Sequence, residues 1–154
     1  MPKVAKRWDV IAARYLLAFV FIVYGAFKIA GKQFGLGESL THTTLQNTSP
    51  LNLTWYFFDY SVLYRDSIGL AQIVTGILLM IRRTAPIGAL CFFVIIINIV
   101  LINIGYHIGI DVMIFSSILL AIDCLLLLHY SKRYRALLSD DDSPAPITGA
   151  ADMN

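Results

Sequence analysis

Residues 85–104 read APIGALCFFVIIINIVLINI and contain no charged side chain. A run of about 20 mostly apolar residues forms a helix that is long enough to cross the hydrocarbon core of a bilayer. The rest of the chain has a similar character, because 58% of its 154 residues are hydrophobic and only 14% are charged. Soluble domains have fewer hydrophobic and more charged residues. The sequence therefore predicts an integral membrane protein.

In addition to residues 85–104, three other segments are predicted to span the membrane. Residues 10–30 and 110–130 are long enough by themselves. The apolar stretch 68–81 would reach only about 21 Å at 1.5 Å per residue, so we expect its helix to begin earlier, at Tyr60. Short connections between spans favour antiparallel neighbours. The predicted fold is all-α, an integral membrane four-helix bundle with antiparallel up-down topology and spans at about residues 10–30, 60–81, 85–105 and 110–130.

The basic residues predict the orientation of this bundle. Nine of the twelve Lys and Arg residues open the first span, lie between the second and third, or follow the fourth; the other three are Lys28, Lys32 and Arg65. By the positive-inside rule, the N and C termini are cytoplasmic and the loop of residues 31–59 lies outside. The aromatic half of that loop is expected at the membrane–water boundary. Residues 136–154, rich in acidic, proline and small residues, are predicted to be a disordered cytoplasmic tail.

Polar side chains interrupt the apolar pattern in residues 98–111, which read NIVLINIGYHIGID. Polar groups inside a membrane are costly and often functional. Because several of them fall at one depth near the outer end of the bundle, we expect a shared polar pocket that binds a ligand. The alternative is a hydrogen-bonded plug that only fixes helix packing. The candidate ligand-binding residues are Tyr24, Lys28, Gln72, Asn98, Asn103, His107 and Asp111.

A second polar pair is expected near the cytoplasmic side. Arg14 and Asp123 fall at compatible depths in the first and fourth spans. A charge in hydrocarbon costs on the order of 3 kcal/mol or more, and an ion pair between these two residues would offset that cost. We therefore predict a structural ion pair. The alternative is an aspartate that reaches toward the interface or is held protonated by burial.

The spacing of cysteine and histidine residues excludes several kinds of redox centre. Cys91 and Cys124 do not form a C-x-x-C pair, and His42, His107 and His129 are dispersed. No zinc, haem or iron–sulfur pattern is present. Without a cofactor motif or an activated nucleophile, the chain is not expected to catalyse a reaction alone. We predict no metal and no bound cofactor other than a quinone.

Three stretches resemble the DoxX-like family of small four-helix bacterial membrane proteins. They are RYLLAFVFIVYGAFKI at 14–29, WYFFDYSVLYRDSIGLAQIVTGILLMIRRT at 55–84, and NIVLINIGYHI at 98–108 after the GAL of 88–90. The resemblance implies a multi-pass protein of the bacterial inner (plasma) membrane. Some members of this family are named as membrane subunits of a thiosulfate:quinone oxidoreductase or as partners of redox enzymes.

The sequence departs from the family pattern at two places. Relatives often have Gly-Leu-Ala-Glu where this chain has Gln72, and Tyr-Asp-x-Pro-x-Lys where it has Tyr106, His107 and Asp111. The positions of acid and base are thus exchanged. A reaction that needs an acid at position 72 is not expected here.

These observations lead to three hypotheses for function. The first is a binding or accessory subunit of a membrane redox system, in which Lys28, Gln72, Asn103 and His107 bind the head group of a quinone-like lipophilic ligand. The second is a structural or accessory protein without a ligand. The third is a small transporter or proton pathway, with Asn98 between the outer cluster and Asp123. The expected partners are the lipid bilayer and other proteins of a membrane complex, and no nucleic acid.

Overall fold

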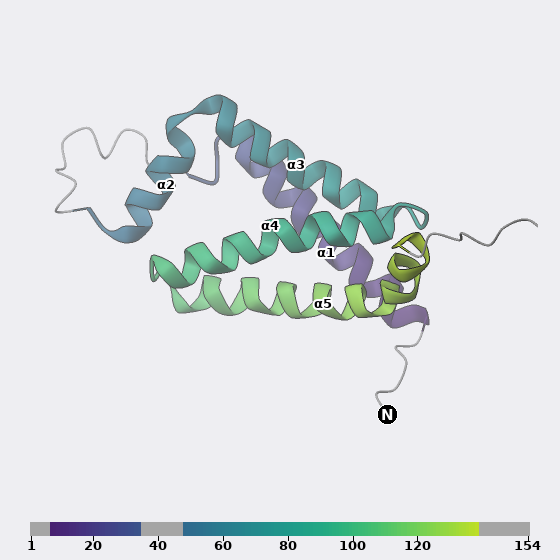
Figure 1. Cartoon of the computed structure of the whole chain (residues 1–154). Coiled ribbons are helices and arrows are strands. Elements are labelled where there is room, and N and C mark those ends of the chain that lie inside the picture. Colours follow the sequence, from purple (N-terminus) through teal and green to yellow (C-terminus); the bar gives the residue numbers. More distant parts are fainter. Residues whose placement is uncertain (1–6, 35–47, 139–154) are drawn as a thin grey trace, which may run out of the picture.

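The computed structural model describes residues 7–34 and 48–138, and its regular structure within them is entirely helical (Figure 1). The helices are α1 (Arg7–Ile29), α2 (Pro50–Tyr60), α3 (Val62–Met80), α4 (Ala85–Gly105) and α5 (Ile110–Leu138). All except α2 are long and apolar enough to cross a membrane. The prediction of an all-α, multi-pass membrane protein with four long apolar helices is confirmed. The predicted disordered tail lies outside the described residues from position 139 onward, as do positions 35–47 of the predicted outer loop.

The four long helices form two packed pairs. Helix α1 lies along α3, and α4 lies along α5. Contacts between α3 and α4, and fewer between α1 and α5, join the pairs into one bundle. Figure 1 shows that α3, α4 and α5 run in alternating directions, as their short connections require.

Helices α1 and α3 approach so closely that their backbones touch. A Cβ atom built on Gly25 would lie 2.5 Å from the carbonyl oxygen of Gly69, and one built on Gly69 would lie 2.8 Å from that of Gly25. Farther along the same contact, a Cβ on Gly76 would lie 2.9 Å from the carbonyl oxygen of Ala18. Small residues allow this close approach between helices in lipid, where packing replaces the hydrophobic effect as the main attraction.

The apolar core joins the two helix pairs. Phe21 of α1 and Phe92 of α4 stack with their ring centroids 3.7 Å apart, and both side chains are fully buried. Leu79 of α3 and Leu126 of α5 belong to the same core cluster. Many other large apolar side chains point outward, as expected for helices that face lipid.

The second span differs from its prediction at its N-terminal end. Two helices meet at Ser61, where a single helix from Tyr60 was expected. Ser61 has an extended backbone (φ −111°, ψ 111°), and its Oγ accepts a hydrogen bond from the backbone N–H of Tyr64, so it caps α3 and ends α2. Part of the predicted outer loop is therefore the helix α2, which Ser49 caps in the same way.

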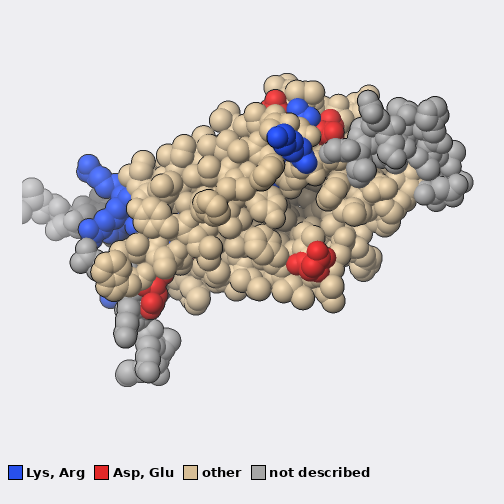
Figure 2. Space-filling view, turned by 180° about the vertical axis from the view of Figure 1, so that it is seen from behind, with Lys and Arg blue, Asp and Glu red and all other residues tan. Residues whose placement is uncertain are grey.

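Charged side chains gather at the two ends of the bundle. Figure 2 shows Lys and Arg at the end where α1 begins, α3 meets α4 and α5 finishes. A smaller group of mixed sign lies toward the other end, and most of the surface between them is uncharged. This distribution is typical of a protein whose middle is surrounded by lipid.

Candidate functional site

Lys28, in the last turn of α1, is a buried cation. Its side chain is only 6% exposed, and its Nζ donates a hydrogen bond to Gln33 Oε1 at 2.9 Å. The same Nζ lies 5.9 Å from the ring centre of Tyr24 and 5.6 Å from that of Phe34. Two aromatic faces and one amide oxygen therefore partly replace the water that this ammonium group has lost.

Gln72 is buried at the same crossing of α1 and α3. It is 1% exposed, and its Oε1 has no hydrogen-bond donor. A Cβ built on Gly25 would lie 3.3 Å from Gln72 Cβ, and one built on Gly69 would lie 3.2 Å from Lys28 Cβ. Lys28 and Gln72 thus flank one point of contact, about one helical turn apart. We call these two residues the Lys28–Gln72 site.

An aromatic group covers the side of this site that faces α2. Phe34, which contacts the Lys28 ammonium, is 5% exposed and packs against Trp55 and Phe58 of α2 with ring centroids 6.3 and 5.8 Å apart. Phe58 also stacks on Tyr64 at the start of α3. These four residues, Phe34, Trp55, Phe58 and Tyr64, form what we call the aromatic roof.

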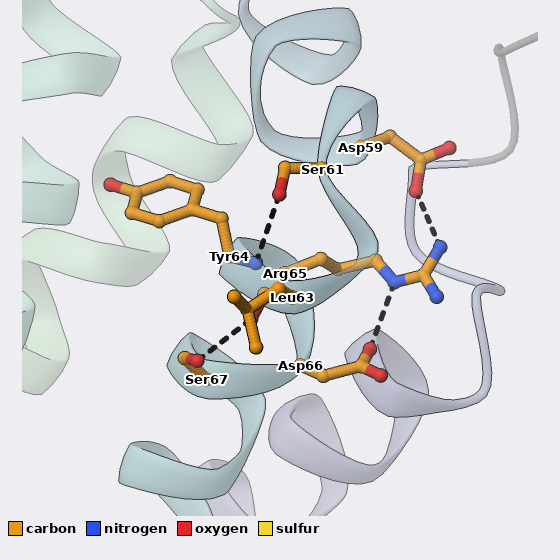
Figure 3. Close-up of polar contacts among 7 residues, drawn as sticks. All are labelled: Asp59, Ser61, Leu63, Tyr64, Arg65, Asp66 and Ser67. Atoms are coloured by element: carbon orange, nitrogen blue, oxygen red, sulfur yellow. Dashed lines mark hydrogen bonds and ion pairs between the residues drawn. The ribbon is translucent and has the colours of Figure 1, made fainter.

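Arg65 links the last turn of α2 to the first turns of α3. Its Nη1 pairs with Asp59 Oδ1 at 2.8 Å and its Nε with Asp66 Oδ1 at 3.2 Å (Figure 3). The guanidinium also lies near Gly31, because a Cβ built there would be 3.5 Å from Nη1. Arg65 therefore holds α2 in place at the junction from which the aromatic roof extends.

Asn103 belongs to a different contact from the Lys28–Gln72 site. Its Nδ2 donates to Ser116 Oγ at 3.0 Å, and Ser116 donates in turn to the carbonyl oxygen of Met113 at 3.1 Å. Both side chains are buried, at 5% and 3% exposure. This pair joins α4 to α5 and favours the packing interpretation for Asn103.

The structure does not bring the seven predicted ligand-binding residues into one interior cluster. Lys28, Gln72 and Asn103 are buried, whereas Asn98, His107 and Asp111 lie on the surface. Helix α4 ends at Gly105, and His107 follows with a positive φ of 49°, so the helical spacing that would align it with Asn103 is lost. Tyr24 is 40% exposed and borders the Lys28 ammonium from the lipid side.

The predicted ion pair between Arg14 and Asp123 is not formed. Arg14 donates from Nε to the carbonyl oxygen of Leu79 and from Nη2 to that of Met80, each at 2.9 Å. Asp123 is fully buried, and neither carboxylate oxygen accepts a hydrogen bond. The last carbonyl groups of a helix lack donors within the helix, so those of α3 compete successfully for the guanidinium.

Sequence reasoning missed several residues that shape the site. Gln33 and Phe34 fall in the predicted loop of residues 31–59, and Ser116 falls in the predicted span of residues 110–130. The sequence pattern singled out none of the three. The periodicity of α5 does contain a signal, because Ser116 and Asp123 are seven residues apart and therefore share a face. Within residues 7–34 and 48–138, no group of three or more His, Cys, Asp or Glu side chains could hold a metal ion.

Comparison with known proteins identifies one relative. The chain is 40% identical over 120 residues to the uncharacterized protein YwoB of Bacillus subtilis (strain 168), an alignment that covers 78% of this chain and 75% of YwoB. This chain belongs to the YwoB family. No family model and no solved structure matches it. Membership of the YwoB family establishes a relationship and assigns no activity.

Proposed function

We propose that this protein is a DoxX-like protein of the bacterial inner membrane that binds a quinone-like lipophilic ligand at the Lys28–Gln72 site. In this proposal it is a binding or accessory subunit of a membrane redox system. One observation carries the proposal: Gln72 Oε1 is buried without a donor at the α1–α3 crossing that also buries Lys28. An unsatisfied buried carbonyl oxygen costs about 1–3 kcal/mol, which a ligand that supplies a donor would recover.

The chemistry of the two side chains suits the head group of a quinone or a quinol. A quinone carbonyl can accept hydrogen bonds from Lys28 Nζ and from the amide N–H of Gln72. A quinol hydroxyl can donate to Gln72 Oε1, the group that lacks a donor. The faces of Tyr24 and Phe34 border the ammonium and offer a flat apolar contact for the ring. Such sites combine apolar walls with a few convergent polar groups.

The amide at position 72 also indicates what the site would not do. A carboxyl group there could carry a proton during a redox reaction, whereas the Gln72 amide cannot titrate. Binding and orientation of the ligand, with the redox chemistry performed by a partner protein, agree with this difference. The residues therefore support an accessory role better than a catalytic one.

Ligand retention in mild detergent tests this proposal. Protein purified from native membranes should carry a quinone that mass spectrometry detects near one equivalent. Gln72→Leu and Lys28→Met should each remove most of it, because each deletes a polar contact to the head group. His107→Ala is the matched control and should retain the quinone, since His107 lies on the surface. Equal retention in all variants, or no quinone in the unmodified protein, contradicts the proposal.

The orientation of the bundle is part of the same proposal. With both termini in the cytoplasm, the Lys28–Gln72 site lies toward the outer leaflet of the membrane. The nine basic residues at the other end support this orientation through the positive-inside rule. In a Cys91→Ala, Cys124→Ala background, Gly37→Cys should react with a membrane-impermeant maleimide in intact spheroplasts. Lys132→Cys should react only after permeabilisation, and the reverse pattern would refute the orientation.

A second function, structural support without a ligand, is favoured by the contact between Asn103 and Ser116. That pair satisfies its polar groups within the protein and needs no ligand. If Gln72→Leu lowers stability and changes no bound molecule, the structural function is the correct one.

A further inference from the structure

Asp123 lies on the buried face of α5. That face repeats every three or four residues, and its members Ser116, Leu119, Asp123, Leu126 and Tyr130 are all buried. Asp123 has no exposed surface, and both of its carboxylate oxygens lack a hydrogen-bond partner. It is therefore a carboxyl group that points into the bundle and contributes no polar contact to the fold.

The residues packed around this part of α5 do not neutralise the carboxyl group. On α1 the buried ionisable residue of the inner half is Arg14, whose guanidinium is bonded to the end of α3. The buried residues of α3 and α4 that the structure describes include no Asp, Glu, His, Lys or Arg. Other titratable side chains near this part of the bundle are Cys91 on α4 and Cys124, Tyr130 and Tyr134 on α5. The hydroxyl group of Tyr134 donates to the carbonyl oxygen of Pro86 at 2.8 Å.

The surrounding core is apolar. Leu119 and Leu126 flank Asp123 on its own helix, and Phe92, Ile96 and Leu79 belong to the same cluster. An ionised carboxylate in such a place would lose its hydration without receiving a donor in return, whereas a neutral carboxyl group loses much less. The arrangement favours the form that carries a proton.

We propose that Asp123 is a proton-binding site in the membrane interior, which exchanges its proton with water at the basic end of the bundle. Binding converts the carboxylate and one proton from water into a carboxylic acid, and release reverses this step without any redox change. Exchange at the basic end follows from distance. Along α5, Asp123 is about 13 Å from Lys132, the nearest charged residue toward the basic end, and about 18 Å from Asp111, the nearest charged residue toward the other end.

This site is separate from the Lys28–Gln72 site and does not depend on the proposed function. The two sites share no residue, and Asp123 is a carboxyl group where Gln72 is an amide. A bundle that binds no quinone could still bind a proton at Asp123.

Infrared spectroscopy of the full chain in liposomes tests the proposal directly. At about pH 6, roughly two units above the usual range of an aspartate, exposed carboxyl groups are ionised and only a buried one keeps its acid C=O band. The unmodified protein should show such a band. The band should move on labelling with [4-¹³C]aspartate and shift in D₂O. Absence of the band, or a band that does not shift after prolonged exchange in D₂O, overturns the proposal.

Variants assign the band to one residue. Asp123→Asn should lose it, and Asp111→Asn, a change at an exposed position of the same helix, should keep it. Asp123→Glu should show a carboxylic acid band at a shifted frequency. This shift assigns the band to position 123 even if Asp123→Asn does not fold. A band that survives in a folded Asp123→Asn protein, or that Asp111→Asn removes, refutes the assignment.

Discussion

Arg14 of α1 donates a hydrogen bond from its Nε to the carbonyl oxygen of Leu79 in the last turn of α3, at 2.9 Å. Its Nη2 bonds the next carbonyl oxygen, that of Met80, at the same distance. A cation at this place also interacts favourably with the negative end of the helix dipole. Helices α1 and α3 are therefore joined at two places along their length. Arg14 joins them near the basic end of the bundle, and the Gly25–Gly69 contact joins them nearer the opposite end.

Replacing Arg14 should destabilise the bundle. Arg14→Leu removes two charged hydrogen bonds and leaves two helix-end carbonyl groups without donors, at a cost of about 2–4 kcal/mol in the free energy of unfolding. Arg14→Lys should cost less, because the ammonium keeps the charge and can reach one carbonyl oxygen. Unfolding by increasing denaturing detergent, followed by circular dichroism, measures both.

A double-mutant cycle distinguishes this helix cap from the ion pair that the sequence suggested. If Arg14 and Asp123 are not paired, the effects of Arg14→Leu and Asp123→Asn on the free energy of unfolding should add within about 0.5 kcal/mol. A coupling energy well above that value would show that the two side chains do interact.

The α1–α3 contact should not tolerate a methyl group. Gly69→Ala would place a Cβ atom 2.8 Å from the backbone oxygen of Gly25, so the helices must separate. We expect a loss of about 1–3 kcal/mol in the free energy of unfolding. Gly105→Ala is the matched control in α4, since nothing lies within 4 Å of the added atom, and it should be neutral. Similar losses in both variants would contradict the close approach.

The hydrogen bond between Asn103 and Ser116 should contribute modestly to stability. Ser116→Ala removes the acceptor of Asn103 Nδ2, and we expect a loss of about 0.6–2 kcal/mol in the free energy of unfolding. Ser117→Ala, at the exposed neighbouring position, removes only a bond to Met113 within the same helix and should change less. Detergent unfolding curves of the two variants give the comparison, and a larger effect of Ser117→Ala would contradict the structure.

The Arg65–Asp59 ion pair should restrain α2 more than it stabilises the whole protein. Asp59→Asn should change the free energy of unfolding by no more than about 1 kcal/mol, because both partners are partly exposed to solvent. Amide hydrogen exchange in α2 should nevertheless become faster. Asp66→Asn is the control, since its contact with Arg65 is longer, at 3.2 Å, and joins adjacent residues of α3. Unchanged exchange in Asp59→Asn would show that the aromatic roof alone holds α2.

Much of the fold could be predicted from local pattern. Each long apolar segment forms a helix because backbone polar groups in lipid must bond within the segment, and residues 85–104 carry that signal without interruption. The end of the second span was predicted less well. Ser61 could either continue one long helix or cap a new one, and the local sequence does not choose between these two. In the structure Ser61 caps α3, and Phe58 and Tyr64 of the aromatic roof stack across the break.

Five of the buried polar residues were found by sequence, but their partners were not. Hydropathy identifies Arg14, Lys28, Gln72, Asn103 and Asp123 as unusual in spans because the cost of burying them depends mainly on depth, which sequence position approximates.

Which groups meet depends on the rotation of each helix about its axis and on the exact end of its neighbour, which contacts between distant residues determine. The sequence alone thus determined the four apolar helices, the basic end and the presence of costly interior groups. The tertiary structure decided that Arg14 bonds the end of α3, that His107 lies on the surface, and that Gln72 Oε1 and both carboxylate oxygens of Asp123 lack hydrogen-bond partners. Hydrogen bonds require positions correct to a few tenths of an ångström, and only the packed bundle supplies them.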